Sequence, residues 1–320
     1  MLNPLVSIII LSWNVRDLLR ACLRSLPIGD SRIEIIVVDS ASTDGAPAMV
    51  QSEFPQVRLM ASAENMGYTR GNNLGLRAAR GRYLLILNPD TEISGDALAQ
   101  MTAYMEAQPQ VGVLGPQLLY PDGRIQSTRR RFPTFLTALV ESTWLQPYVG
   151  RGLLDHFYAR DLRDDEIAEV DWVMGAAMFV RRQAYEQVGG LDEQFFMYSE
   201  ELDWCRRMSA AGWKVVYFPP ARIIHHQARS AAQVPAQTHI RFNSSKVLYV
   251  RKYRGWMLAE LLRCWLLGQF ALQLILEAAK WLLGHKRELR AQRLNIYWQV
   301  LRSGLRPPRH AEDHGALSGG

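Results

Sequence analysis

The chain has 320 residues, with 37 Lys plus Arg against 31 Asp plus Glu, and 48% of its residues are hydrophobic. This composition excludes disordered, collagen-like and low-complexity proteins, and the length fits one large domain or two smaller ones. The three cysteines, Cys22, Cys205 and Cys264, are far apart and form no CxxC pair. Neither a disulfide scaffold nor a structural zinc site is therefore expected, and a reducing cytoplasm fits.

The net charge of +6 is unevenly distributed along the chain. Residues 1–240 hold 23 basic and 26 acidic side chains, a net charge of −3, whereas residues 241–320 hold 14 and 5, a net charge of +9. The first residues lack the basic region and small-residue cleavage site of an export signal, and no run of about 20 apolar residues predicts a spanning helix. We expect a cytoplasmic protein, soluble or bound to a surface, whose basic excess lies in its last quarter.

The first 120 residues alternate between short β-branched runs and longer amphipathic stretches. The pattern predicts strands at 6–11, 33–39, 57–61, 83–87 and 111–114, and helices at 16–26, 46–53, 70–80 and 95–107. Continuous apolar strands that alternate with helices are typical of an α/β fold, in which a mostly parallel sheet has helices on both faces.

Polar side chains follow three of these strands. In such sheets ligands bind outside the carboxyl ends of the strands. One such residue alone is most simply a helix cap, but several at one edge indicate a cleft. The residues are Ser12, Trp13 and Asn14 after the first strand, Asp39 after the second, and Asn88 and Asp90 after the fourth.

The turn after the first strand excludes two common nucleotide sites. It contains neither GxGxxG nor GxxxxGK[ST], which disfavours a dinucleotide dehydrogenase and a P-loop NTPase. A nucleotide bound here would need another device for its phosphates, and a metal held by Asp90 is the candidate. Mg²⁺ is usually bound by one or two carboxylates together with phosphate oxygens.

The middle of the chain is less regular. Residues 120–170 predict a loop region or lid with a few helical turns, and Arg129–Arg131 are expected on a solvated face, with a basic lid over phosphates as the alternative. Residues 172–180 predict a glycine-interrupted strand that borders a cleft. The helix expected at 182–188 ends at Gly189-Gly190.

Three acids, Glu200, Glu201 and Asp203, open a helix predicted at 200–211. Acids in a first turn suit the helix dipole, but three in four positions exceed that need. Their mutual repulsion should raise a pKa among them, as a general base requires. After a strand at 214–218, Pro219-Pro220 and an apolar run lead into His225-His226, where a histidine is a candidate metal ligand.

Seven segments in this order resemble the family 2 glycosyltransferases, specifically a rhamnosyltransferase-like bacterial branch with the GT-A fold. The resemblance covers about residues 5–230. The segments are VSIIILSWN (6–14), VVDSASTDG (37–45), ENMGYTRGNNLGL (64–76), GRYLLILNPDT (81–91), WVMGAAMFVRR (172–182), GGLDEQFFMYSEELDWCRR (189–207) and IIHH (223–226).

The resemblance implies a role for each candidate residue in binding a nucleotide-diphospho sugar. Asp39 would contact the base, and Asp90 would hold Mg²⁺ or Mn²⁺ on the diphosphate, because Asn88-Pro89-Asp90 stands where the family has DxD. His225 would complete the metal site. The other residues implied are Ser12, Trp13, Asn14, Asn65, Asn72 and Asn88 for the nucleotide sugar, and Trp172, Gly175 and Ala176 for the acceptor and sugar pocket.

The resemblance also implies an inverting transfer with a carboxylate base. Glu200-Glu201 matches a Glu-Asp pair whose second member is the base. Because Glu201 replaces the more common Asp, the choice among Glu201, Glu200 and Asp203 stays open. The glycines often found after the histidine are absent, and Gln227-Ala228-Arg229 stand in their place.

The basic last quarter predicts helices over residues 246–306. On the most apolar helix, about 256–283, a narrow polar stripe contrasts with an apolar remainder, which fits a helix lying in a membrane interface, and basic segments at 251–254 and 286–293 would attract anionic headgroups. The alternatives are packing on the catalytic domain or a partner subunit, and a re-entrant or spanning helix. The stripe comprises Arg263, Gln269, Gln273, Glu277 and Lys280, and the interfacial tryptophans are Trp256, Trp265 and Trp281.

We therefore expect a GT-A catalytic domain at 1–240, a membrane-associating helical extension at 241–306 and a flexible tail at 307–320. The expected enzyme is a metal-dependent inverting glycosyltransferase at the inner face of the cell membrane. It would move L-rhamnose from dTDP-rhamnose to a hydroxyl of a lipid-linked or cell-envelope glycan. UDP-galactofuranose, UDP-glucose and UDP-N-acetylglucosamine are alternative donors, and a homo-oligomer is compatible with this interpretation.

A basic nucleic-acid-binding protein or a scaffold is the alternative from a different class. It is disfavoured because the basic residues of the last quarter alternate with Leu and Trp in a helical pattern and no nucleic-acid motif occurs. No nucleic-acid partner is expected.

Overall fold

The computed structural model describes residues 4–226 and 233–306. The chain divides into two compact units, which we describe separately. Unit 1 contains the described residues of 1–132, 155–193 and 200–230, and unit 2 contains those of 133–154, 194–199 and 231–320.

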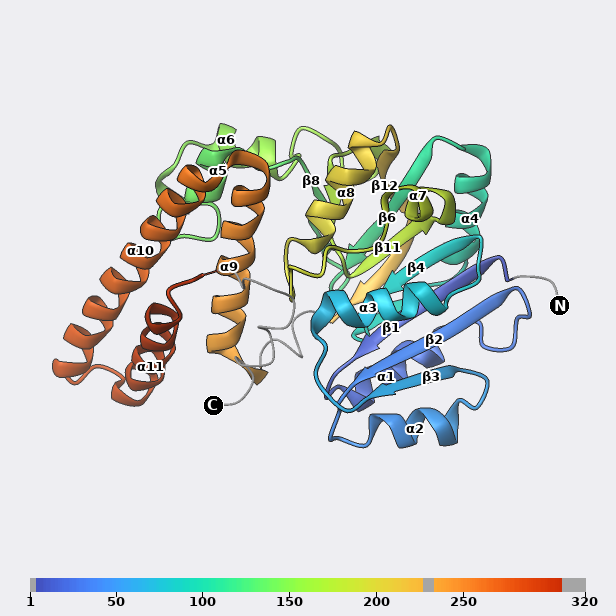
Figure 1. The fold of residues 1–320 in the computed structure, drawn as a ribbon, viewed down its shortest axis with the longest axis horizontal. Coiled ribbons are helices and arrows are strands. Elements are labelled where there is room, and N and C mark those ends of the chain that lie inside the picture. The colour runs from blue at the N-terminus through green and yellow to red at the C-terminus, as the bar shows by residue number, and fades with distance from the viewer. Residues whose placement is uncertain (1–3, 227–232, 307–320) are drawn as a thin grey trace. The chain divides into compact units, whose positions relative to one another are not determined.

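Unit 1 is built on a 10-stranded sheet with the order β3-β2-β1-β4-β11-β6-β12-β5, while β7 and β9 pair at its margins (Figure 1). The first four strands run parallel, and β11 is antiparallel to both β4 and β6. The strands are β1 (Val6–Ser12), β2 (Ile33–Ser40), β3 (Arg58–Ser62), β4 (Tyr83–Leu87), β5 (Thr91–Ile93), β6 (Val111–Leu119), β7 (Ile125–Gln126), β9 (Ala168–Glu169), β11 (Ala177–Arg181) and β12 (Lys214–His225). A separate pair consists of β8 (Arg129–Arg130) and β10 (Trp172–Val173).

Helices cover both faces of this sheet, as predicted. Successive residues of β1 point to opposite faces, so Ile8 and Ile10 belong to one core cluster and Ile9 to the other. The first cluster is closed by α1 (Arg16–Arg24), α2 (Ala46–Glu53) and α4 (Ala97–Ala107), and the second by α3 (Gly67–Ala78), α7 (Arg182–Val188) and α8 (Glu200–Ala210). The predicted α/β class is confirmed.

Several elements differ locally from the prediction. The strand expected at 172–180 is two strands, β10 and β11, which belong to different sheets. The strand expected to end before Pro219-Pro220 continues to His225, because a register shift between Phe218 and Arg222 accommodates the prolines.

The arginine triplet also differs from the prediction. Arg129 is buried, 2.5 Å from Asp164 in an ion pair and stacked on the Tyr217 ring. The expectation of a solvated face is wrong for this residue, because β8 places it under the 159–164 segment.

Unit 2 is helical. Its core contains Ile240, Val247, Leu262, Leu266 and Val300. Figure 1 shows its three long helices side by side, in agreement with their contacts. Its elements are α5 (Phe135–Val140), η1 (Gln146–Tyr148), α9 (Pro235–Arg254), α10 (Trp256–Leu282) and α11 (Arg287–Ser303), and α6 (Arg151–Phe157) leads back into unit 1.

The units divide the chain differently from the predicted domains. Helix α9 runs through residue 240, where the boundary was expected, and residues 194–199 belong to unit 2. The Ser245 hydroxyl donates to the Met197 carbonyl at 2.8 Å, and the Tyr198 ring lies 5.5 Å from that of Phe242. Tyr198 and Ser199 have φ angles of 71° and 66°. The predicted tail at 307–320 lies outside the described residues.

Candidate active site

The strand ends that carry the predicted residues converge at one edge of the unit 1 sheet. Ser12 and Asp39 are register partners at the ends of β1 and β2. The antiparallel strand β11 begins at this edge, since Ala177 pairs with Leu87 at the end of β4. The end of β12 reaches the same region, because His225 pairs with Thr91, the residue after Asp90.

Two buried polar atoms at this edge lack a partner within the described residues. Asp39 accepts a hydrogen bond from the Ser42 N–H at 2.9 Å through Oδ2, but its Oδ1 has no partner. The hydroxyl of Ser12, on the neighbouring strand, also has none. Buried polar atoms are costly to leave unpaired, so these two atoms are candidate contacts for a ligand.

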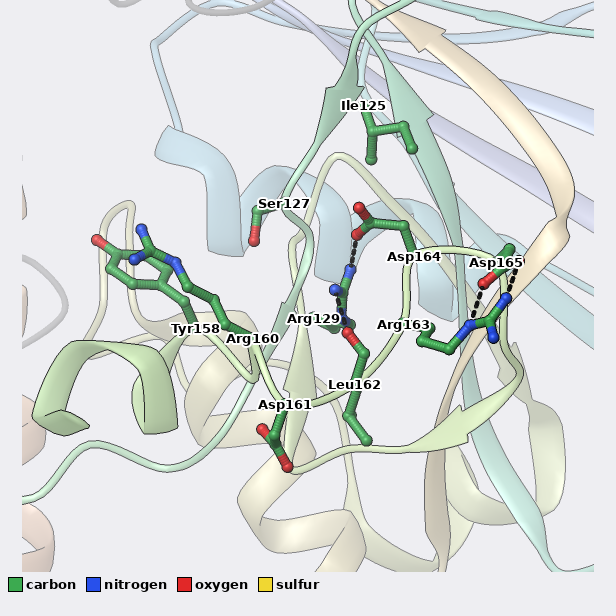
Figure 2. A pocket seen from close by; sticks show the side chains of 10 residues that line it. All are labelled: Ile125, Ser127, Arg129, Tyr158, Arg160, Asp161, Leu162, Arg163, Asp164 and Asp165. Carbon is green, nitrogen blue, oxygen red and sulfur yellow. Dashed lines mark hydrogen bonds and ion pairs between the residues drawn. The ribbon is translucent and has the colours of Figure 1, made fainter. Parts of the chain in front are cut away.

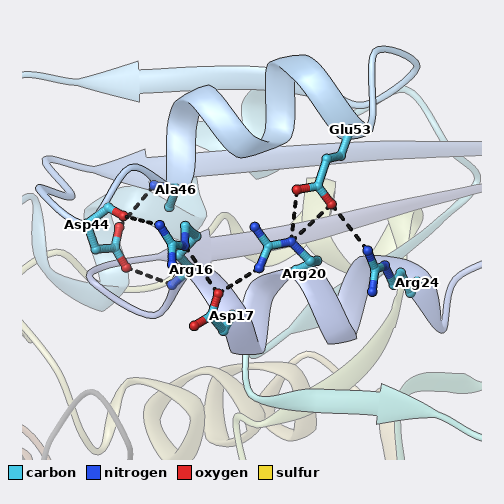
Figure 3. Close-up of polar contacts among 7 residues, drawn as sticks. All are labelled: Arg16, Asp17, Arg20, Arg24, Asp44, Ala46 and Glu53. Carbon is cyan, nitrogen blue, oxygen red and sulfur yellow. Dashed lines mark hydrogen bonds and ion pairs between the residues drawn. The ribbon is translucent and has the colours of Figure 1, made fainter.

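The loop after β2 is fastened to α1 (Figure 3). Asp44 accepts hydrogen bonds from the backbone N–H groups of Arg16 at 2.7 Å and Ala46 at 3.0 Å. Arg20 pairs with Glu53 at 2.9 Å, which ties α1 to α2. Exposed pairs of this kind contribute little stability individually, but together they fix the loop that follows Asp39.

Asn14 serves the same loop rather than pointing freely into a cleft. Its side-chain oxygen accepts from the Thr43 N–H at 2.8 Å, its own N–H donates to Ser42 at 3.0 Å, and its φ is 52°. Trp13, beside it, is partly exposed. The structure therefore gives Asn14 a positioning role for the Asp39 loop.

Helix α3 packs unusually close to β1. A Cβ at Gly71 or Gly75 would lie 2.3 Å from Leu11 Cδ1 or Ile9 Cγ2, so a larger residue at either position would force these side chains to move. Asn65 accepts from the Gly67 N–H at 3.0 Å and starts the helix three residues earlier than predicted. Asn72 is buried, donates to the Tyr68 carbonyl at 2.9 Å, and leaves its Oδ1 without a partner in the described chain.

Asp90 and His225, the two residues expected to hold a metal, lie next to each other. The Nε2 of His225 lies 3.5 Å from Oδ1 of Asp90, and both side chains are buried. Gln126 donates to the His225 carbonyl at 2.7 Å, which orients its own Oε1 toward His225 Nδ1 at 2.9 Å. This amide orientation suits an Nδ1–H donor, and Nε2 faces the Asp90 carboxylate.

Two electron-pair donors that face each other fit a cation between them. No cluster of three His, Cys, Asp or Glu side chains occurs in the described residues, so the remaining ligands would be donor phosphates and water, as is common for Mg²⁺. Asn88 joins the end of β4 to the segment before β11, because its backbone N–H donates to the Ala176 carbonyl at 2.9 Å. The neighbouring His226 is engaged elsewhere, 2.7 Å from Glu92.

The two glutamates that open α8 have different electrostatic surroundings. Burial raises the pKa of Glu201, while the backbone N–H groups of Glu201, Gly175 and Leu202 and the charge of Arg130 oppose that rise. Burial and the charge of Glu201 raise the pKa of Glu200 well above its usual range. One oxygen of each carboxylate is without a hydrogen-bond partner in the described residues.

Asp203 has a different role. Its side chain is 0% exposed and lies 2.8 Å from Arg207 Nε. Arg207 also donates to the carbonyls of Val188 at 2.9 Å and Gly190 at 2.7 Å, and Trp204 donates to Gly189 at 2.9 Å. Asp203 thus holds α8 against the end of α7.

Gly175 lies between Glu201 and a tyrosine that the sequence did not single out. The Tyr68 hydroxyl donates to the Gly175 carbonyl at 2.7 Å, and a Cβ at Gly175 would lie 3.2 Å from that hydroxyl and 3.6 Å from Glu201 Cβ. Burial and then the charges of Glu200, Glu201 and Asp90 raise the pKa of Tyr68 well above its usual range. Its position one helical turn before Asn72 is the signal that could have revealed it.

Trp172 lies beside Arg130, the second residue of the arginine triplet. Its indole N–H donates to the Arg131 carbonyl at 3.1 Å, and the Arg130 guanidinium lies 6.0 Å from its ring and 4.6 Å from that of Tyr158. The pairing of β8 with β10 creates this arrangement, and no sequence pattern announces it.

A separate pocket of about 560 Å³ lies beside Tyr158 and contains none of the predicted site residues (Figure 2). Its charged side chains all have ion-pair partners: Arg129 pairs with Asp164 and Arg163 with Asp165 inside the pocket, while Arg160 pairs with Asp155 and Asp161 with Arg131 outside it. The pocket is therefore electrostatically self-satisfied, and we assign it no ligand.

The mixed sheet with helices on both faces has the GT-A fold. A mannosyltransferase of Pyrobaculum calidifontis, solved in complex with GDP-Man and Mn²⁺, superimposes with a TM-score of 0.53 at 17% identity, over 95% of this chain and 86% of that one. The chain belongs to glycosyl transferase family 2, whose family model matches residues 7–189. That match ends before α8.

Curated relatives extend further along the chain. The N-acetylglucosaminyl-diphospho-decaprenol L-rhamnosyltransferase of Mycobacterium tuberculosis is 28% identical over 285 residues, which cover 85% of this chain and 92% of the relative. Rhamnosyltransferase WbbL of Escherichia coli is 27% identical over 232 residues, covering 69% and 83%. The predicted family, with its rhamnosyltransferase-like branch, is confirmed.

Proposed function

We propose that this enzyme is an inverting, metal-dependent rhamnosyltransferase that moves L-rhamnose from dTDP-L-rhamnose to a hydroxyl of a lipid-linked glycan. The observation that carries the proposal is the gathering of Asp39, Asp90 with His225, and Glu201 around one sheet edge. The names of the two curated relatives support rhamnose as the sugar, and that of the mycobacterial relative supports a lipid diphosphate acceptor. UDP-sugars are the alternative donors.

The donor base would lie against Asp39. Its unpartnered Oδ1 is an acceptor for the N3–H of a pyrimidine, and the Ser12 hydroxyl can donate to a base carbonyl. Asn72, with a free Oδ1, is available to a hydroxyl of the nucleotide sugar.

Asp90 and His225 would hold a divalent cation, Mg²⁺ or Mn²⁺, on the diphosphate. A cation in this place supplies Lewis-acid stabilisation of the negative charge that develops on the leaving group. Gln126, 2.9 Å from Nδ1, would orient the His225 ring so that Nε2 is available as the ligand atom.

Glu201 would act as general base. Its carboxylate takes the proton from the acceptor hydroxyl while that oxygen attacks C1 of the sugar from the face opposite the diphosphate. The new C1–O bond forms as the bond to the diphosphate breaks, which inverts the configuration. Glu200 stays protonated beside it, because two buried neighbouring carboxylates do not both ionise readily.

The acceptor would approach along Trp172, Gly175 and Ala176, next to Glu201. We place the enzyme in the cytoplasm at the inner face of the cell membrane, where residues 246–293 contact the anionic surface. This location is consistent with a lipid-linked acceptor.

A donor screen tests the proposal. The melting temperature would be measured with dTDP-L-rhamnose and with each UDP-sugar, with Mn²⁺, with Mg²⁺ or with EDTA. Saturation about 100-fold above Kd stabilises by about 2.7 kcal/mol, so dTDP-L-rhamnose with metal should raise the melting temperature by several degrees. Transfer of rhamnose to a lipid-diphosphate-linked N-acetylglucosamine would then be followed by mass spectrometry.

Two variants make the screen specific. Asp39→Asn should abolish the shift, whereas Asp44→Asn, on the same loop but bonded to Arg16, should retain it. No stabilisation of the wild type by any nucleotide sugar would overturn the proposal, and a shift with a UDP-sugar alone would replace the donor.

A further inference from the structure

Helix α10 exposes an uninterrupted apolar stripe. Its members follow the three- and four-residue spacing of one helix face, and none carries a charge or a hydrogen-bonding side chain. Leu261, Ile275 and Leu282 are 60%, 65% and 70% exposed. The stripe, which we call the outer stripe, comprises Met257, Leu261, Cys264, Gly268, Leu272, Ile275, Ala279 and Leu282.

The buried polar residues of α10 face the other helices of unit 2. Glu277 is buried and lies 2.5 Å from Arg290 of α11, itself nearly buried. Arg263 donates to the Gly304 carbonyl at 3.0 Å. Rotating α10 to hide the outer stripe would leave the Glu277–Arg290 pair broken in the interior, which is strongly unfavourable. The fold of unit 2 therefore fixes the apolar face outward.

Both ends of the outer stripe are basic. Arg251, Lys252 and Arg254 precede α10, and Lys286 and Arg287 follow it. Trp256 and Trp281, at its two ends, are 65% and 39% exposed. An apolar strip with tryptophans and cations at both ends matches an anionic bilayer surface, where indole rings and basic side chains lie at headgroup depth.

The same charges disfavour a second copy of the chain as the occupant. Pairing of two α10 helices, whether parallel or antiparallel, would place a basic end beside a basic end. Like charges at a desolvated contact oppose association. A phospholipid surface of opposite charge removes that conflict.

The neighbours of α10 argue against a spanning arrangement. By length and composition α10 could cross a membrane, and only 22% of its most apolar window is buried. However, α11 packs along it and exposes Arg287, Arg293 and Arg302, whose charges are costly in hydrocarbon. A helix that lies in the interface keeps these charges in water.

We propose that unit 2 docks on an anionic phospholipid bilayer through the outer stripe, with α10 parallel to the surface and its basic ends at the headgroups. This inference deepens the proposed function, because docking would bring the enzyme to a lipid-linked acceptor. It rests on the proposed function only in assuming that the acceptor lies in the membrane.

Vesicle binding by the full chain tests the proposal. Sedimentation would compare phosphatidylcholine vesicles with vesicles that contain about 30% phosphatidylglycerol. We expect the wild type to prefer the anionic vesicles. The double variant L261E/I275E should bind at least tenfold more weakly, since it places two carboxylates in the face that inserts. The matched control is Ile167→Glu, a similarly exposed apolar residue of unit 1, which should bind as the wild type does.

A second variant addresses the cations. R251Q/K286Q should weaken binding to anionic vesicles about fivefold per lost charge and leave the weaker binding to neutral vesicles unchanged. The nucleotide-sugar thermal shift should be the same in all variants, so a failure of docking is distinguishable from a failure of the proposed function.

Three results would overturn the inference. They are a wild type that binds no vesicles, an L261E/I275E variant that binds like the wild type, and a wild-type dimer that becomes monomeric in that variant with no loss of vesicle binding. The last result would identify a second copy of the chain as the occupant.

Discussion

Glu200 and Glu201 are adjacent in the sequence but have distinct surroundings. Glu201 is supported by backbone N–H groups and by Arg130, whereas Glu200 is buried beside a negative charge. Neighbouring carboxyls whose pKa values are driven apart commonly divide the roles of base and bystander. This difference selects Glu201 as the base in our proposal.

Glu201→Gln should lower kcat by a factor of about 100 or more, because the amide cannot accept the proton. Since burial raises the pKa of Glu201, wild-type activity should decline with falling pH already above the usual Glu range. Steady-state kinetics across pH would measure both effects. Near-normal turnover in Glu201→Gln, or an equal loss in Glu200→Gln, would move the base role to Glu200.

Glu200→Gln should stabilise the protein at neutral pH. A carboxyl whose folded pKa is raised binds its proton more tightly when folded, so its contribution to stability is present below the unfolded pKa and lost as pH rises through the folded pKa. A glutamine at this position does not ionise, so the variant does not lose this stability as the pH rises. The melting temperature of the variant should exceed that of the wild type at pH 7.5, and the two should converge near pH 4. A lower melting temperature at pH 7.5 would contradict this account.

Tyr68→Phe tests whether the hydrogen bond from Tyr68 to the Gly175 carbonyl positions the Gly175 N–H that stabilises ionised Glu201. Without the hydroxyl, the Gly175 carbonyl loses its bond, and the backbone N–H that favours ionised Glu201 is less well held. We expect kcat to fall about tenfold and the acidic limb of the pH profile to move upward. The control is Tyr104→Phe, whose ring packs on Phe218. An unchanged pH profile with reduced kcat would assign Tyr68 to substrate contact instead.

At the scale of elements, α8 is held in place by the ion pair between Asp203, in its first turn, and Arg207, one turn later. Asp203→Asn should lower stability by about 1–3 kcal/mol, because it weakens a buried charge-assisted bond. The corresponding decrease in melting temperature is about 3–10 °C. Calorimetry and kinetics together distinguish this role from catalysis: folded Asp203→Asn should keep most of its turnover. A loss as large as that of Glu201→Gln would return Asp203 to the catalytic group.

The sequence predicted the elements whose pattern is local. The apolar runs of β1, β2 and β4 are buried on both faces, and the polar residues after them do meet at one edge. It could not predict that β11, some 90 residues after β4, lies between β4 and β6, because that pairing is non-local. For the same reason Gln126 beside His225 and the burial of Arg129 have no local signal.

At the scale of the whole molecule, the two units are interleaved along the chain. Unit 2 draws on residues 133–154 and 194–199 as well as the last helices. Truncation after residue 240 would therefore remove most of α9 and all of α10 and α11. Ala138 of α5, which belongs to the hydrophobic core of unit 2 together with residues of these helices, would be left uncovered. We expect the 1–240 fragment to be poorly soluble and to unfold without cooperativity, as measured by expression and circular dichroism. A soluble fragment with a sharp thermal transition would show that 1–240 is an independent domain.

The chain leaves unit 2 for unit 1 at the peptide bond between Ser199 and Glu200. Met197 and Tyr198, which contact α9, precede Glu200 by three and two positions, and Tyr198 and Ser199 have positive φ angles that few side chains tolerate. Replacement of α9 would alter the contacts that hold this segment. We therefore expect substitutions in α9 and in residues 197–199 to co-vary among relatives.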